Sequence, residues 1–158
     1  MHPYQTDAVC SELKIPVNAV WLGGLGVLPF AASSAVAVLA SPQTVAHGEF
    51  ALLVYGAIIL SFLGGILWGR ILALGCVEAV SKETRSLVVS IVPSLIGWIA
   101  VLIGPGLGLP ALAIAFFLMM ATDLIHAKCN LFPAWYPKLR VPLTLTVIPF
   151  LLLPTVFG

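Results

Sequence analysis

The sequence predicts an all-α integral membrane protein, a helical bundle with five transmembrane helices in one domain over residues 1–158. The composition is the first indication, because 61% of the residues are hydrophobic and only 8% are charged. A soluble domain carries about 25% charged residues, so this chain lacks the polar side chains that would cover a water-exposed surface. The second indication is an uncharged run from residue 50 to 69, which matches the roughly 20 residues that cross a hydrocarbon core.

The first two transmembrane helices are predicted at residues 17–40 and 50–74. The apolar part of the first is much longer than the roughly 7–15 residues of a signal-peptide core, so we expect it to be retained. Pro29 should kink this helix, because proline removes one backbone donor and crowds the preceding turn. Glu49 suits the start of the second helix, where an acid interacts favourably with the positive end of the helix dipole.

The uncharged run from residue 86 to 122 is too long for one crossing. Residues 104–110 contain two prolines and three glycines, a composition that interrupts helices, and we expect them to divide the run. Pro93 should kink the helix that precedes this division. The remaining helices are therefore predicted at residues 87–103, 111–127 and 141–157.

Small residues recur on one face of the second predicted helix. Ala57, Ser61, Gly65 and Gly69 are each four residues apart, and Gly64 widens the face. In lipid such a stripe lets two helix backbones approach closely, so we interpret it as a helix-packing seam. The alternative is that the glycines leave room for a ligand such as a lipid tail or a quinone. Nothing in the stretch selects one ligand over another.

The lysines and arginines predict the orientation in the membrane. With five crossings, all seven fall on the same side as the N-terminus, and the opposite side has none. The positive-inside rule therefore places the N-terminus in the cytoplasm and the C-terminus outside. The seven residues are Lys14, Arg70, Lys82, Arg85, Lys128, Lys138 and Arg140.

Four short sequence segments, taken in their order along the chain, resemble a family of small multispanning membrane proteins catalogued as a domain of unknown function. The family is widespread in bacteria and has an uncharacterised, mitochondria-associated animal relative. The resemblance implies the bacterial inner membrane, or the mitochondrial inner membrane if the protein is eukaryotic. It transfers no catalytic or binding residues. The segments are residues 21–30 (WLGGLGVLPF), 55–69 (YGAIILSFLGGILWG), 90–98 (SIVPSLIGW) and 133–144 (PAWYPKLRVPLT).

Two charged residues lie within or at the end of predicted membrane helices. Asp123 is near the cytoplasmic end of the fourth helix, and Arg70 is at the same end of the second. A charge in hydrocarbon costs about 2.5–3.5 kcal/mol on insertion scales, so such residues usually pair or have a function. We expect Asp123 to pair with Arg70 or to reach the interface. The alternatives are a titrating carboxyl on a proton path and a lipid-headgroup site.

The sequence contains no pattern that predicts a metal, a cofactor or an enzyme. Asp123 and His126 are neighbours on a helix, but Cys129 lies a further turn away and is rotated from them, so no metal site is expected. No nucleophile–base constellation or phosphate-binding glycine loop is present. A net charge of +1 without a basic, aromatic-rich patch gives no support for nucleic-acid binding.

Two functional hypotheses remain. The first is a non-enzymatic accessory or assembly protein that packs its glycine-rich face against a larger membrane complex. The second is a small transporter or channel, which with five short helices would need to oligomerise and would couple to protons through Asp123. The partners expected are therefore the lipid bilayer and either another membrane protein or further copies of this chain.

Overall fold

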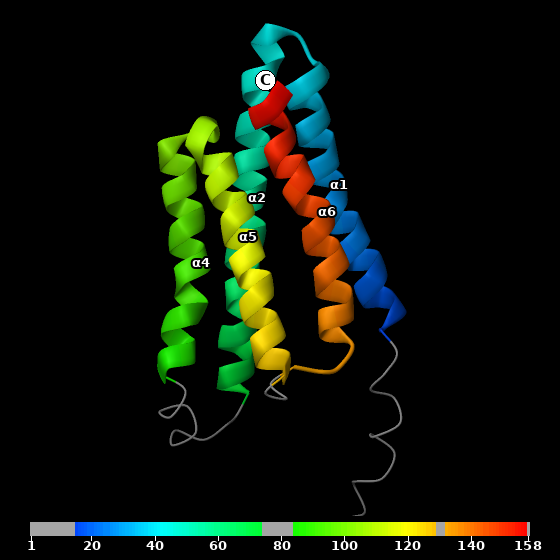
Figure 1. Ribbon diagram of the computed structural model, residues 1–158, viewed down its shortest axis with the longest axis vertical. Helices are drawn as coiled ribbons and strands as arrows, with labels where there is room; N and C mark the ends of the chain where they lie inside the picture. The colour runs from blue at the N-terminus through cyan, green and yellow to red at the C-terminus, as the bar shows by residue number, and fades with distance from the viewer. Residues whose placement is uncertain (1–14, 74–83, 129–131, 158) are drawn as a thin grey trace, which may run out of the picture.

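The computed structural model describes residues 15–73, 84–128 and 132–157, and these residues form a bundle of helices lying side by side (Figure 1). The predicted all-α class is confirmed, with five helices in the described ranges. Helix α2 is central, because it contacts each of the other four. The helices are α1 (Val17–Leu39), α2 (Pro42–Leu72), α4 (Thr84–Ile103), α5 (Pro105–Lys128) and α6 (Tyr136–Phe157).

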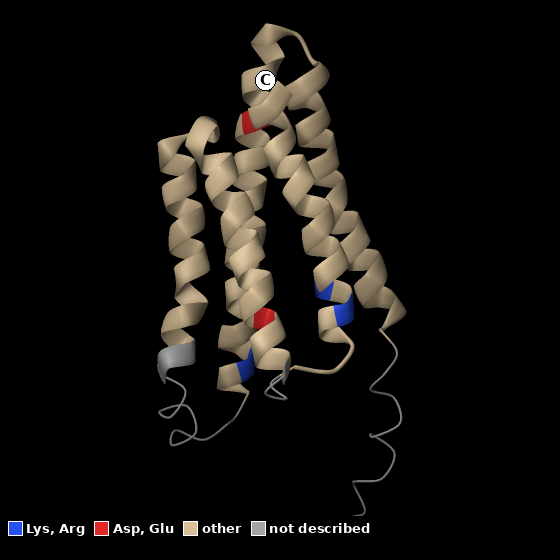
Figure 2. Ribbon diagram, in the orientation of Figure 1, with Lys and Arg blue, Asp and Glu red and all other residues tan. Residues whose placement is uncertain are grey.

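Four of the described helices, α1, α2, α5 and α6, are long and apolar enough to span a membrane. The apolar part of α4, Leu87–Ile103, is shorter. The chain therefore has the character of a membrane helical bundle, and the crossing by α4 stays a prediction. Figure 2 shows that the lysines and arginines of the described residues gather at the end of the bundle opposite the C-terminus.

Four helices begin earlier than the sequence analysis placed them, α4 at Thr84 rather than at 87 and three others by a larger margin. Helix α2 starts at Pro42 rather than near residue 50, and α5 starts at Pro105 rather than at 111. Helix α6 starts at Tyr136, directly before Pro137, rather than at 141. Proline needs no backbone partner in the first helical turn and already has the helical φ, so these prolines begin helices. The predicted end of the second helix at residue 74 lies outside the described residues.

The division between α4 and α5 is a single residue. Gly104 has a φ of +91°, a conformation that side-chain-bearing residues rarely adopt, and its N–H donates to the carbonyl of Ala100. Helix α5 then begins at once, and Pro110 lies inside it. The seven-residue interruption expected at 104–110 is therefore reduced to Gly104.

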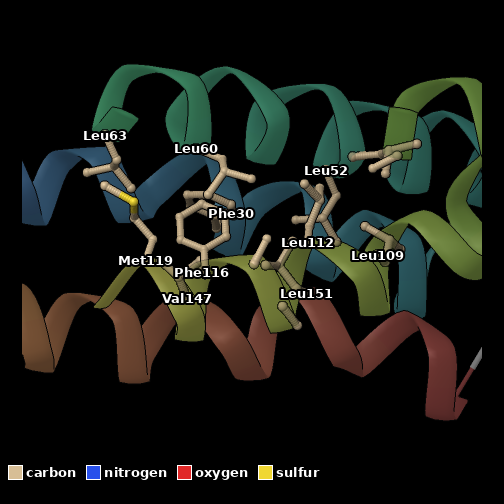
Figure 3. Close-up of a cluster of buried hydrophobic side chains, with 14 residues drawn as sticks. Phe30, Leu52, Leu60, Leu63, Leu109, Leu112, Phe116, Met119, Val147 and Leu151 are labelled. Carbon is tan, nitrogen blue, oxygen red and sulfur yellow. The ribbon is translucent and has the colours of Figure 1, made fainter. Parts of the chain in front are cut away.

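The main core lies between α1, α2, α5 and α6 (Figure 3). Phe30 of α1 is at its centre, with its ring edge-on to Tyr55 at 4.8 Å and to Phe116 at 6.0 Å between centroids. Leucines from the neighbouring helices fill the space around these rings. Besides Phe30 and Phe116, the residues labelled in Figure 3 are Leu52, Leu60, Leu63, Leu109, Leu112, Met119, Val147 and Leu151.

Part of the predicted seam packs against α4. The backbone of Ala57 approaches Gly97 so closely that a Cβ on that glycine would lie 3.1 Å from the Ala57 carbonyl oxygen. The hydroxyls of Ser61 and Ser94 form a hydrogen bond of 2.8 Å across the interface. Small side chains on both helices therefore hold α2 and α4 in close contact, as packing in lipid requires.

The remaining glycines of the predicted seam lie on two different faces of α2. A Cβ on Gly64 would overlap the backbone oxygen of Ser90, so this glycine belongs to the interface. Gly65 and Gly69 are exposed, and a Cβ on either would meet no other described atom within 4 Å. Successive helical residues are about 100° apart around the axis, so Gly64 and Gly65 face different neighbours.

Pro29 and Pro93 lie inside helices. Helix α1 is continuous through Pro29, and α4 is continuous through Pro93, which is buried against the α2 side. A kink at each proline stays a prediction.

We predict that Gly64→Ala destabilises the protein while Gly65→Ala does not. Both changes add the same methyl group to the same helix, so their intrinsic helix propensities cancel. At Gly64 the methyl group meets backbone, which cannot move aside without separating α2 from α4, and overpacking of this kind costs about 1–3 kcal/mol. The melting temperature in detergent should fall for Gly64→Ala only. Equal melting temperatures for the two variants would contradict the assigned interface.

Candidate functional site

A buried ion pair joins α5 to α6. The Nε of Arg140 donates to Oδ2 of Asp123 at 2.9 Å, and the side chains are 8% and 4% exposed. The hydroxyl of Tyr136 donates to the same carboxylate oxygen at 3.3 Å. Each charge thus neutralises the other inside the bundle, where an unpaired charge is expensive.

The positions of the two charges follow from the helix boundaries. Asp123 is near the end of α5, and Arg140 is in the second turn of α6. Because α5 and α6 pack together and the chain between them is short, these two segments meet at one end of the bundle. Tyr136, in the first turn of α6, lies one turn before Arg140 and therefore on the same face.

The ion pair predicted between Asp123 and Arg70 is corrected to one with Arg140. In the described part of the chain, no salt bridge joins Arg70 to Asp123. The Arg70 guanidinium carbon instead lies 5.9 Å from the ring centroid of Phe132. Phe132 stacks on Tyr136 with centroids 4.7 Å apart. The rings of Phe132 and Tyr136 therefore lie between Arg70 and the ion pair.

The residues considered for metal binding do not form a site. The ring of His126 lies edge-on to Phe132 at 6.3 Å between centroids. Cys129 lies outside the described residues. Within the ranges that the structure describes, no group of three or more His, Cys, Asp or Glu residues is arranged to hold a metal ion.

A cavity of about 400 Å³ adjoins the ion pair, with walls from α1, α2, α5 and α6. Its lining is apolar, and includes Gly23, Gly26 and Phe116, except for two side chains of α6. These are Arg140 and Thr144, which are four residues apart and so share a face of the helix. The ion pair and the cavity thus form one site with a polar side and an apolar side.

Each of the two polar residues of the cavity has a side-chain atom without a hydrogen-bond partner among the described residues. Nη2 of Arg140 and Oγ1 of Thr144 are buried and have no hydrogen-bond partner among the described residues. A buried donor without a partner costs about 1–3 kcal/mol, and more when it is charged. Such groups in a native structure often indicate a bound species.

The comparison with protein families decides the classification. A family model described as "Protein of unknown function (DUF3429)" matches residues 15–156. The chain belongs to the DUF3429 family. This confirms the resemblance read from the sequence, and identifies a transmembrane helical protein of a family without an assigned activity.

Two relatives of this DUF3429 protein are both called "Transmembrane protein 69". The one from Xenopus tropicalis is 31% identical over 133 residues, which cover 84% of this chain and 51% of the relative. The one from Mus musculus is 27% identical over 146 residues, which cover 90% of this chain and 57% of the relative. The chain thus spans about half the length of these relatives. No solved structure matches.

The sequence analysis of the DUF3429 chain identified Asp123 but missed Arg140, Thr144 and the cavity. Arg140 was assigned to a loop, because the last helix was expected to begin at residue 141. A signal was present nonetheless. Arg140 and Thr144 have the four-residue spacing of one helix face, and Pro137 marks a suitable helix start.

We predict that Asp123→Asn destabilises the protein by about 3–5 kcal/mol, because it leaves a buried guanidinium without a counter-charge. Adding Arg140→Gln should recover part of this loss, since the two residues are coupled. Adding Arg70→Gln instead should leave the loss unrecovered, because Arg70 is not the partner. Thermal unfolding of the single and double variants measures these differences. Recovery by Arg70→Gln rather than Arg140→Gln would contradict the structure.

Proposed function

We propose that this DUF3429 protein is a non-enzymatic accessory or assembly protein that binds a helix of a larger membrane complex against α2. One observation carries the proposal, an exposed stripe along α2 with glycines at its centre. The stripe consists of Ile58, Phe62, Gly65, Gly69 and Leu72, all of them exposed.

The spacing of the stripe suits another helix. Its members are alternately four and three residues apart, the pattern by which one helix contacts a second along its length. Gly65 and Gly69 leave a recess between the large side chains of Phe62 and Leu72. In lipid, close backbone approach at such a recess provides dispersion contacts, whereas lipid chains need no recess.

The proposed topology has five crossings, with the N-terminus in the cytoplasm and the C-terminus outside. The support comes from the seven lysines and arginines, which all fall on the N-terminal side of this arrangement. The proposed location is the bacterial inner membrane, or the mitochondrial inner membrane in a eukaryote. The two relatives are named only as transmembrane proteins, so this location rests on the charge distribution and the resemblance.

A second candidate is a proton-coupled transporter that acts as an oligomer. The observation in its favour is that Asp123 carries a buried carboxylate, and that its partner Arg140 lines a cavity. The ion pair with Arg140 argues against it, because a carboxylate held by a fixed guanidinium is poorly suited to exchange protons. We therefore rank the accessory role first.

We predict that reporter domains fused after Ser41 and at the C-terminus are found outside. Reporters fused after Lys82 and after Pro133 should be found in the cytoplasm. The reason is that positive residues near membrane helices are retained on the cytoplasmic side. Reporter activity in intact cells gives the measurement. A cytoplasmic C-terminal reporter would contradict five crossings in this orientation.

We predict that the wild-type protein, purified in mild detergent, retains a different membrane protein and that Gly65→Leu loses it. The Cβ of the new leucine has no described atom within 4 Å, so the substitution should not force α2 away from its neighbours and the melting temperature should not fall. Gly24→Leu is the matched control, because Gly24 is also exposed with open space around it, but lies on α1. This control should retain the partner.

Other outcomes would overturn the accessory role. If the wild type retains no protein, or if Gly65→Leu and Gly24→Leu behave alike, the stripe is not a docking face. If only further copies of this chain are retained, and Asp123→Asn abolishes a proton flux seen for the wild type in proteoliposomes, the transporter is the correct function.

A further inference from the structure

The cavity beside the ion pair presents polar groups from one helix and apolar groups from the others. Its volume of about 400 Å³ falls in the range of about 300–1,000 Å³ that small-molecule sites occupy. Arg140 and Thr144 supply the polar groups, both from α6. The remaining lining is hydrocarbon or glycine. An occupant that matches these walls has one polar part and a larger apolar part.

The polar groups are more than nine-tenths buried, and two of their atoms have no hydrogen-bond partner among the described residues. Arg140 is 7% exposed and Thr144 is 1% exposed. Neither Nη2 of Arg140 nor Oγ1 of Thr144 bonds to another part of the described protein. A guanidinium N–H donates and cannot accept, so the polar part of the occupant must offer an acceptor oxygen.

We infer that the cavity binds a neutral amphiphile, whose carbonyl oxygen accepts hydrogen bonds from Arg140 and Thr144 and whose apolar part fills the rest. The carbonyl can belong to a quinone ring or to an acyl ester of a lipid. This inference does not rest on the proposed docking of a partner helix at α2.

The charge at the site is what favours a neutral head. Asp123 already balances the positive charge of Arg140 through the 2.9 Å bond from Nε. A carboxylate in the cavity would therefore bring a net negative charge into a medium of low dielectric constant, which is unfavourable. A carbonyl accepts the same hydrogen bonds and adds no charge.

The cavity opens toward the lipid-facing surface. Leu22 of α1 and Phe62 of α2 line it, yet they are 71% and 66% exposed. Arg140 lies one turn inside the start of α6, about 6 Å along the axis. A polar head there remains close to the membrane surface while an apolar chain extends past Leu22 of α1 into lipid. An amphiphile can thus enter from the bilayer.

The test is equilibrium binding to the purified full chain in detergent, followed by native mass spectrometry. Three probes are used: methyl oleate for the acyl ester, decylubiquinone for the quinone, and oleate as the charged counterpart of methyl oleate. We expect at least one neutral probe to bind, and methyl oleate to bind more tightly than oleate.

The decisive variant is Thr144→Val, which replaces the hydroxyl by a methyl group of nearly the same size. Because Oγ1 has no partner among the described residues, the melting temperature without probe should not fall. Affinity for the neutral probe should fall roughly tenfold, the effect of losing one hydrogen bond. Thr144→Ser keeps the hydroxyl and should bind like the wild type.

Thr146→Val is the matched control on the same helix. The hydroxyl of Thr146 is exposed and donates to the Pro142 carbonyl, and Thr146 does not line the cavity. This variant should leave probe affinity unchanged.

Each outcome decides the inference. Loss of affinity in Thr144→Val for decylubiquinone alone assigns a quinone, and loss for methyl oleate alone assigns an acyl ester. Loss for both supports the shared carbonyl chemistry. If no neutral probe binds, if Thr144→Val binds as the wild type does, or if oleate binds more tightly than methyl oleate, the inference is wrong.

Discussion

The ion pair between Asp123 and Arg140 is the interaction on which the arrangement of α5 and α6 depends. Helices in lipid gain little from burying apolar side chains, because the lipid is equally apolar, so specific contacts must fix their relative positions. Nε of Arg140 and Oδ2 of Asp123 provide such a contact at one end of the helix pair. The same pairing orients α6 so that Thr144 lines the cavity. The Asp123–Arg140 pair thus neutralises the buried charges and also helps to set the lining of the cavity.

Three faces of α2 make different contacts in the bundle. One face carries Leu52, Leu60 and Leu63 into the main core. A second carries Ala57, Ser61 and Gly64 to α4, where small side chains bring the backbones together. The third carries Gly65 and Gly69, and a Cβ on either would meet no described atom within 4 Å. A helix with different chemistry on each face can support a fold and a partner without conflict between them.

Much of the fold could be predicted from the sequence, because uncharged runs of sufficient length are the dominant signal in a membrane protein. The errors came from proline. Pro42, Pro105 and Pro137 were left outside the predicted helices, although they stand in first turns where proline is favourable. The misplaced start of α6 concealed Arg140, and with it the true partner of Asp123. The spacing of the small residues indicated a seam correctly, but spacing alone does not say which neighbour each side chain meets.

The single-residue link at Gly104 has a consequence for biogenesis. Helices α4 and α5 form a hairpin, because only Gly104 separates the end of one from the start of the other. The apolar segment of α4, Leu87–Ile103, carries no charged residue. Attached in this way to the longer α5, α4 can enter the membrane together with it. The two helices then insert as a single hairpin rather than one after the other.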